Sequence, residues 1–89
     1  MIPPLSIGYT IYSKPDCVYC DKAKQLIKDA KEISIEKDYP SFLEFIRPYT
    51  QKDYRMFPMI FFDGDFIGGF EEARLHREGL RSYDCDQDF

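Results

Sequence analysis

Tryptophan is absent from this 89-residue sequence, histidine occurs once and cysteine three times. Basic residues are also in the minority, with 12 lysines and arginines against 16 aspartates and glutamates and a formal net charge of -4. An acidic chain has no general attraction to nucleic-acid phosphates or anionic membranes, so we expect neither as a partner. The cysteines are odd in number, and two of them lie close together, which argues against the disulfide framework of a small secreted domain.

Long apolar runs are missing as well. No stretch approaches the length that crosses a bilayer, and the opening Met1-Ile2-Pro3-Pro4-Leu5 lacks the basic and apolar regions of a secretion signal. We therefore expect a cytoplasmic protein that does not contact a membrane. A chain of this length supports one hydrophobic core, so we predict a single domain over residues 1–89, a monomer with a flexible acidic tail from about 81 to 89.

Hydrophobic residues make up 44% and aromatic residues 17% of the chain, which is enough for one core. Apolar periodicity, turn residues and a Ser41–Glu44 capping box define the predicted elements. We expect strands at 7–12, 33–37, 57–62 and 65–67, helices that start near residues 17 and 41, and a third helix from about 70 to 80. Pro48 should bend or end the second helix, and Gly79 is a candidate end of the third. This β-α-β-α-β-β-α order predicts an α/β protein with a four-stranded mixed sheet and three helices, and it resembles the thioredoxin fold.

The segment that carries chemistry is Cys17-Val18-Tyr19-Cys20, at the predicted junction of the first strand and the first helix. Its spacing places the second cysteine nearly one helical turn after the first, within reach of a reversible disulfide. The free N–H groups and the positive end of the helix dipole stabilise an anion at Cys17, so we expect its thiol to ionise more readily than a free cysteine. Cys17 is therefore the predicted nucleophile, which forms a mixed disulfide with a substrate sulfur, and Cys20 is the predicted resolving thiol.

Two neighbours of the cysteines have open roles. Lys14 could favour the Cys17 thiolate, hold an anionic substrate or be an ordinary loop lysine. Tyr19 fits either an aromatic rim that packs on a bound thiol or simple structural support.

A Cys-x-x-Cys pair can also be half of a zinc site, which Cys85 and His76 could complete. Against this, the second half lacks the compact spacing of a zinc knuckle, and Cys85 falls in the predicted tail. His76 alone is typical of a surface or half-buried helical histidine. We therefore expect no bound metal and keep a zinc-stabilised structural module as an alternative.

Three segments carry a family resemblance: Lys14-Pro15-Asp16-Cys17-Val18-Tyr19-Cys20, Phe57-Pro58 and Ile67-Gly68-Gly69. They resemble the Cys-Pro-Tyr-Cys, Thr-Val-Pro and Gly-Gly motifs of the glutaredoxins, and the likeness covers nearly the whole chain. Residues 17–24 and the Gly-Gly-Phe segment are especially similar to small phage-encoded glutaredoxins, which donate electrons to ribonucleotide reductase. The resemblance implies a glutathione-dependent dithiol thiol-disulfide oxidoreductase that reduces protein disulfides and glutathione mixed disulfides, in the host cytoplasm if the origin is viral.

The resemblance also implies a glutathione site. Pro58 would follow a cis peptide bond and face the cysteine pair, and the Phe57 backbone would pair with the cysteinyl unit of glutathione. Gly68-Gly69 would let the backbone approach the ligand, and the N–H groups that follow would hold the γ-glutamyl carboxylate. The expected glutathione-binding residues are Lys14, Tyr19, Arg55, Phe57, Pro58, Gly69, Phe70, Glu71 and Glu72, with Lys14 and Arg55 at the glycine carboxylate and Glu72 at the amine.

Two departures from the family pattern matter. Val18 replaces the proline of the motif, which should alter the helix start and the redox potential, and Phe57 replaces a smaller valine, which should reshape the groove. Some glutaredoxins without that proline hold an iron-sulfur cluster between two protomers, and Val18 leaves this alternative open. The chain lacks the Trp-Cys-Gly-Pro-Cys motif of thioredoxin, but a thioredoxin-type reductase in place of glutathione stays open as electron source. Cys85 is expected to be a bystander or a site of oxidation.

Overall fold

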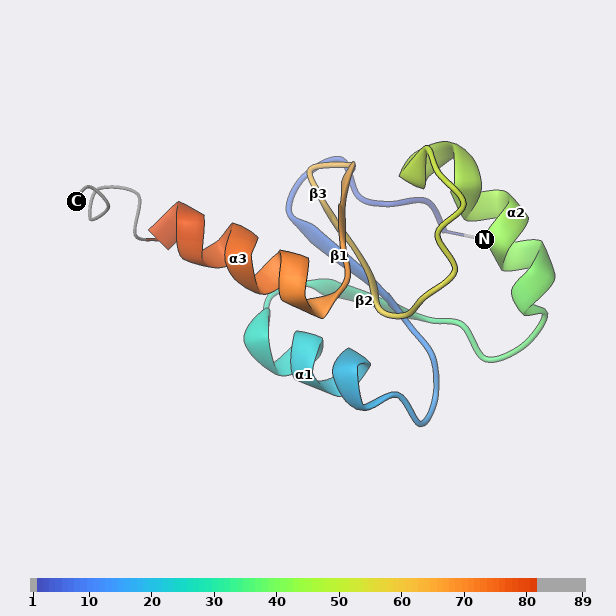
Figure 1. The fold of residues 1–89 in the computed structure, drawn as a ribbon, viewed down its shortest axis with the longest axis horizontal. Coiled ribbons are helices and arrows are strands. Elements are labelled where there is room, and N and C mark those ends of the chain that lie inside the picture. Colours follow the sequence, from blue (N-terminus) through green and yellow to red (C-terminus); the bar gives the residue numbers. More distant parts are fainter. Residues whose placement is uncertain (1, 82–89) are drawn as a thin grey trace.

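Four strands form one mixed sheet in the order β2-β1-β3-β4 in the computed structural model, which describes residues 2–81 (Figure 1). Strand β1 (Tyr9–Ser13) pairs in parallel with β2 (Lys31–Ser34) and antiparallel with β3 (Met59–Phe62). Strand β4 (Asp65–Gly68) pairs antiparallel with β3 on the outer side. The predicted mixed sheet and order of elements are confirmed.

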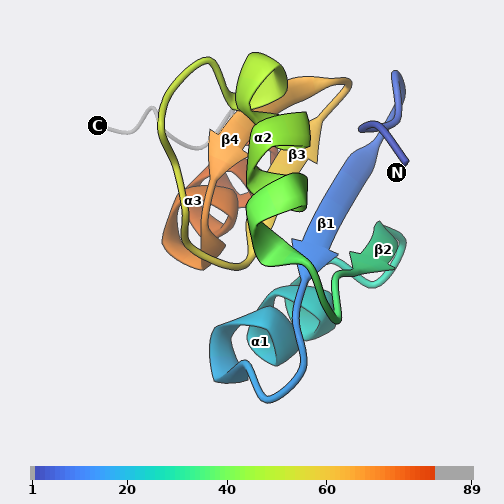
Figure 2. The ribbon, with the colours of Figure 1, turned by 90° about the vertical axis from the view of Figure 1, so that its right-hand side faces the viewer.

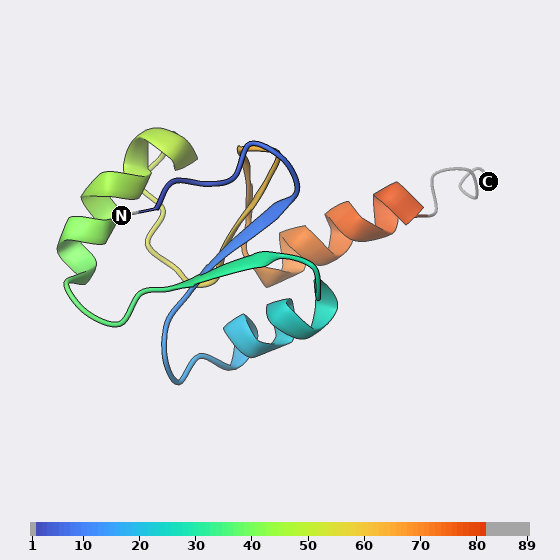
Figure 3. The same cartoon turned by 180° about the vertical axis from the view of Figure 1, so that it is seen from behind.

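Three helices cover the two faces of the sheet: α1 (Val18–Leu26), α2 (Tyr39–Thr50) and α3 (Phe70–Arg81). Helices α1 and α3 pack together on one face, and α2 lies alone on the other (Figures 2 and 3). Within residues 2–81 none of the helices combines the length and the apolar character that crossing a bilayer needs.

Strand β1 is buried along its whole length, since helices cover both of its faces. On the α1/α3 side its residues belong to a core cluster with Ala23, Ile27, Ile60 and Ala73. On the α2 side they belong to a second, mostly aromatic cluster that contains Tyr12, Ile33, Phe42, Ile46, Met59 and Phe61. The strand starts two residues later than the predicted 7–12 and ends one residue later, and Ile7, which is 79% exposed, precedes it.

The predicted capping box at Ser41 is wrong, because α2 starts two residues earlier, at Tyr39. Its N-cap is Asp38, which has a left-handed backbone (φ 57°) and makes no side-chain capping bond. Pro40 lies in the first helical turn, where a proline costs no intrahelical hydrogen bond. The proline that was expected to precede the helix therefore belongs to it.

The boundaries of three further elements differ from the prediction. Pro48 does not end α2, which continues to Thr50 and closes through a bond from the Gln51 N–H to the Arg47 carbonyl (2.8 Å). Strand β2 starts two residues earlier than the predicted 33–37 and ends three residues earlier, because its ladder with β1 stops where β1 ends. Helix α3 runs past the candidate end at Gly79 to Arg81, one residue beyond the predicted 80.

The predicted hairpin at Asp63-Gly64 is confirmed. Both residues have positive φ, 52° and 87°, as a two-residue turn of type I′ requires. Residues 82–89 of the predicted tail, Cys85 among them, lie outside the described residues.

Phe42 anchors α2 to the sheet, and its removal should be costly. Its side chain is fully buried, and its ring contacts those of Tyr12 and Phe57 at centroid distances of 5.2 and 5.7 Å. We predict that Phe42→Ala lowers the free energy of unfolding by about 3–5 kcal/mol, because it leaves a cavity in the aromatic cluster. Denaturant unfolding of the parent, Phe42→Ala and Phe45→Ala measures this. Phe45 is only half-buried on the same helix, so an equal loss in both variants would contradict the assignment.

Candidate functional site

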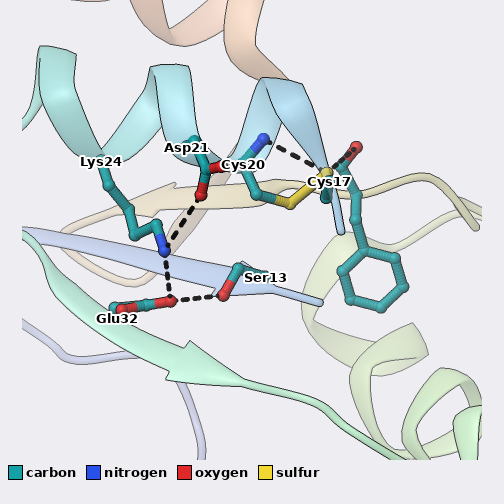
Figure 4. The surroundings of a disulfide bond; sticks show 7 residues. Ser13, Cys17, Cys20, Asp21, Lys24 and Glu32 are labelled. Carbon is teal, nitrogen blue, oxygen red and sulfur yellow. Dashed lines mark hydrogen bonds and ion pairs between the residues drawn. A yellow bond between two sulfur atoms is a disulfide. The ribbon is translucent and has the colours of Figure 1, made fainter. Parts of the chain in front are cut away.

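The cysteine pair lies where the chain leaves β1 and enters α1 (Figure 4). Asp16 turns the chain with a left-handed backbone (φ 57°), and Cys17 is the N-cap of the helix. Cys17 and Cys20 are joined in a disulfide, with their Cα atoms 5.2 Å apart. Cys20 is 1% exposed, whereas Cys17 is half-buried, so Cys17 is the sulfur that a substrate can reach.

The first turn of α1 directs a hydrogen-bond donor at Cys17 Sγ, the more exposed of the two sulfurs. The backbone N–H of Cys20 donates to Cys17 Sγ at 3.2 Å, and the Cys17 carbonyl accepts the first helical bond, from Asp21 N–H at 3.1 Å. Such an N–H, with the positive end of the helix dipole, stabilises a negative charge on this sulfur. The predicted geometry of the pair is therefore confirmed.

A loop from the far side of the sheet reaches the same sulfur. Cys17 Sγ lies 3.9 Å from the carbonyl oxygen of Phe57, and the Phe57–Pro58 peptide bond is cis, as the resemblance implied. Val18, Tyr19 and Met56 surround this point with exposed apolar surface and are 66%, 56% and 67% exposed. Cys17 Sγ thus lies beside an exposed apolar rim.

Two open pockets flank Phe57. The first, about 310 Å³, is called the acidic pocket below because it contains two glutamates and no basic residue among the described residues that line it. Its lining residues are Tyr19, Tyr54, Met56, Phe57, Pro58, Gly69, Phe70, Glu71 and Glu72. The second, about 460 Å³, is called the basic pocket and is lined by Lys14, Pro15, Asp16, Tyr39, Leu43, Arg55 and Phe57. All nine predicted glutathione-binding residues therefore lie in one of these two pockets.

In the acidic pocket, Glu72 folds back on the start of α3. Its Oε1 accepts the N–H of Gly69 at 2.9 Å, which is the glutamate half of a capping box. A Cβ on Gly68 would lie 2.8 Å from the Glu72 Cγ, and Gly68 has a φ of 137°. The glycine pair thus makes room for a side chain of the protein itself.

Tyr54 closes the same pocket from the loop before β3. Its hydroxyl oxygen lies 3.0 Å from the point that a Cβ on Gly69 would occupy, and its ring packs edge-on against Phe66, with centroids 4.9 Å apart. Burial, and then the negative charge of Glu72, raise the pKa of Tyr54. The Tyr54 hydroxyl and the Glu72 carboxylate therefore both lie next to Gly69.

In the basic pocket the two predicted cations differ in their surroundings. The Lys14 ammonium lies over the Phe57 ring, 5.7 Å from its centroid. Arg55 is held by Asp53, with its Nε donating to a carboxylate oxygen at 3.0 Å, and this guanidinium lowers the pKa of Asp53. Lys14 is consequently the cation of this pocket that has no ion pair within residues 2–81.

The sequence did not point to several lining residues. Tyr54 and Met56 belong to the irregular segment between α2 and β3, where no periodicity indicates which side chains face inward. Tyr39 and Leu43 face the basic pocket from α2, whose start was misplaced.

His76 lies away from the cysteine pair. Its Nδ1 is hydrogen-bonded to the Tyr9 hydroxyl at 2.7 Å, and its ring packs on Phe62, with centroids 4.9 Å apart. This is the half-buried role that was predicted.

The zinc alternative also needs Cys85, which is outside the described residues. Within residues 2–81 no three His, Cys, Asp or Glu side chains are grouped as metal ligands.

A glutaredoxin family profile matches residues 9–67, which is more than half of the chain and includes the cysteine pair and the cis-proline loop. The chain belongs to the glutaredoxin family. The matched segment contains the Cys17–Cys20 disulfide at the start of α1.

Relatives and solved structures agree with this glutaredoxin assignment. The mitochondrial glutaredoxin-2 proteins of Pongo abelii and Homo sapiens are each 36% identical over 75 residues, which cover 78% of this chain and 46% and 45% of the two relatives. The chain thus spans less than half of their length. Glutaredoxin 1 from Francisella tularensis has the same fold, with a TM-score of 0.70 at 24% identity over 84% of this chain and 96% of that one. A buckwheat glutaredoxin-glutathione complex has a TM-score of 0.65 at 27% identity, covering 83% and 72% of the two chains.

A network of hydrogen bonds and ion pairs links α1 to the sheet (Figure 4). Glu32 on β2 accepts the hydroxyl of Ser13 at 2.7 Å and the Lys24 ammonium at 3.0 Å. The Lys24 ammonium also forms an ion pair at 3.4 Å with Asp21, the residue that follows Cys20. The network therefore fixes α1 against the end of β1, where the cysteine loop begins.

This network should make stability depend on pH in the acid range. The Ser13 hydroxyl, and then the Lys24 ammonium, hold the pKa of Glu32 below its usual range. A lowered carboxyl pKa adds stability that is present above the unfolded-state value of about 4.3 and is lost as the pH falls through the lower folded-state value. We predict that Glu32→Gln is less stable than the parent by a few tenths of a kcal/mol at pH 7, since the side chain is 38% exposed, and that the difference shrinks below about pH 4. Unfolding at several pH values measures this, with the exposed Glu36→Gln as control. A difference that does not change with pH would contradict it.

Proposed function

We propose that this protein is a glutathione-dependent dithiol oxidoreductase that reduces protein disulfides and glutathione mixed disulfides. The observation that supports this most directly is the position of Cys17. Its sulfur is the more exposed one of a disulfide at a helix N-terminus, and it lies beside the carbonyl of Phe57, the residue that the two pockets share. The similarity to a glutaredoxin that was solved with glutathione supports glutathione as the co-substrate.

The reaction begins with the reduced pair. The Cys17 thiolate, stabilised by the Cys20 N–H, attacks one sulfur of the substrate disulfide, forms a mixed disulfide and expels the other sulfur as a thiol. Cys20 then attacks Cys17, which releases the second substrate thiol and leaves the Cys17–Cys20 disulfide. Two glutathione molecules restore the dithiol and become glutathione disulfide, so that two electrons pass from glutathione to the substrate.

The two pockets suit the two ends of glutathione. Its cysteinyl unit would lie along the Phe57 backbone next to Cys17. Its glycine carboxylate would lie in the basic pocket near Lys14 and Arg55, and its γ-glutamyl end in the acidic pocket. Arg55 would then share its guanidinium between Asp53 and the ligand.

Protein substrates would approach over the exposed rim of Val18, Tyr19 and Met56. Ribonucleotide reductase is the candidate acceptor that the likeness to phage-encoded glutaredoxins suggests. A reducing compartment such as the cytoplasm fits a disulfide that must be reduced in each cycle.

The decisive experiment separates the two cysteines. Glutathione-coupled reduction of a small mixed disulfide and of a protein disulfide is measured for the parent, Cys17→Ser and Cys20→Ser. We expect Cys17→Ser to fall to the uncatalysed rate with both substrates, because it lacks the nucleophile. Cys20→Ser should still reduce the mixed disulfide but lose the protein disulfide, because it cannot resolve the intermediate.

Two results would change the proposal. A parent that is inactive with glutathione but active with a thioredoxin-type reductase would remove glutathione from it. Inactivity with both reductants would contradict the oxidoreductase and direct attention to metal binding.

A further inference from the structure

A third pocket, of about 300 Å³, adjoins the basic pocket. It is called the α2 pocket below, and its lining residues are Pro40, Leu43, Glu44, Arg47, Asp53 and Arg55. Leu43 and Arg55 also line the basic pocket, so the two pockets are neighbours that share one cation. The Arg55 guanidinium can therefore serve a ligand in the basic pocket or a carboxylate in the α2 pocket.

In the structure Arg55 is paired with the carboxylate of Asp53. Its Nε and Nη2 donate to the two oxygens of Asp53, at 3.0 and 3.3 Å. The side chains of Arg55 and Asp53 are 68% and 57% exposed, and an ion pair this exposed to water is weak enough for another anion to displace. Asp53 is thus an internal competitor for any ligand carboxylate that reaches Arg55.

A second guanidinium lies near Asp53, on helix α2. Arg47 lines the same pocket as Asp53 and forms no ion pair of its own within residues 2–81. The Arg55 guanidinium, and more weakly that of Arg47, lower the pKa of Asp53. Arg47 can consequently balance part of the charge of Asp53 when Arg55 is drawn towards a ligand.

We propose that Asp53 and Arg47 set the strength with which Arg55 binds a carboxylate in the basic pocket. They thereby determine how far a thiol with a free carboxylate at this place is preferred over a cysteine inside a polypeptide. Neither side chain lines the basic pocket, so both are positioning residues that act through Arg55. The inference rests on the proposed function, because it assumes that the partner sulfur is bonded to Cys17.

The two residues act in opposite directions. Asp53 lowers the preference for a free carboxylate, since the ligand has to displace it from Arg55. It also keeps Arg55 paired when the partner has a peptide bond at this place and brings no anion, so a protein substrate leaves no cation without a partner. Arg47 raises the preference, because it compensates Asp53 while Arg55 is shared with the ligand.

The test compares two thiols that differ in charge at one end, glutathione and its glycine ethyl ester. Exchange at Cys17 is measured in the Cys20→Ser background, where the mixed disulfide persists. The reaction is Cys17–S–S–R + R′–SH giving Cys17–S–S–R′ + R–SH, so one disulfide breaks, one forms and the thiol proton moves to the released sulfur. Intact-protein mass spectrometry gives the equilibrium ratio of the glutathione adduct to the ester adduct, and the bulk of the ester cancels when variants are compared.

We expect Asp53→Asn to raise this ratio about two- to fivefold, the range for the loss of an exposed ion pair. Arg47→Gln should lower the ratio by a smaller factor, and Arg47→Lys, which keeps the charge, should restore most of the parent value. Glu44→Gln is the matched control, because Glu44 lines the same pocket but is not bonded to Arg55 in the described part of the chain. All three positions are exposed, so the variants should remain folded.

A double variant separates action through Asp53 from direct action on the ligand. If Arg47 acts through Asp53, Arg47→Gln should not change the ratio once Asp53→Asn is present. An undiminished effect of Arg47→Gln in that background would overturn the inference, because the charge of Arg47 would then act on the ligand itself. Equal gains in Asp53→Asn and Glu44→Gln would overturn it as well.

The outcomes also distinguish this inference from the proposed function. Adducts that form with both thiols, at a ratio that Asp53→Asn does not change, would overturn only the present inference. The absence of any glutathione adduct on Cys17 would overturn the proposed function.

Discussion

The site depends on the register between β1 and β3. The last pair of this antiparallel ladder is Tyr12 with Met59, so the chain leaves β1 at Ser13 just where it enters β3 from Pro58. The loop that carries Cys17 and the loop that carries the cis-proline therefore meet at the same end of the two central strands. Because β1 is buried on both faces, a slip by one residue would move each of its side chains into the core cluster on the opposite face, so the register is strongly specified.

Phe57 joins the aromatic core to the two pockets beside Cys17. Its ring packs on the buried Phe42 of α2 and on Tyr39, with centroid distances of 5.7 and 5.9 Å, while its carbonyl faces Cys17. The Lys14 ammonium lies over the same ring. A larger residue than the valine usual in the family thus joins the basic pocket to the hydrophobic core, and the position of the backbone beside Cys17 is tied to the packing of α2.

The sequence was most informative where local chemistry decides the structure. The apolar periodicity that follows the Cys17–Cys20 pair placed it at a helix start, and Asp63-Gly64 specified its hairpin, because both depend on nearby residues in the chain. The start of α2 at Tyr39 was missed because a proline in the first turn of a helix looks the same in sequence as one that precedes it. Tyr54 was missed because its place depends on how an irregular segment packs on β4 and α3, a tertiary contact with no sequence period.

Glu72 shows how one side chain couples helix start, backbone conformation and ligand charge. Its bond to Gly69 stabilises the first turn of α3, and its stem lies where a Cβ on Gly68 would be, so the glycine is needed for the cap. With its carboxylate fixed in this way, the negative charge is present in the pocket before any ligand arrives and requires no reorganisation on binding. The net charge of -4 acts over the whole surface and is screened by salt within about 8 Å at physiological ionic strength, whereas this carboxylate acts at contact distance. A molecule that enters this pocket therefore meets the Glu72 carboxylate at contact distance, whereas the net charge of the chain acts on it only through screening solvent.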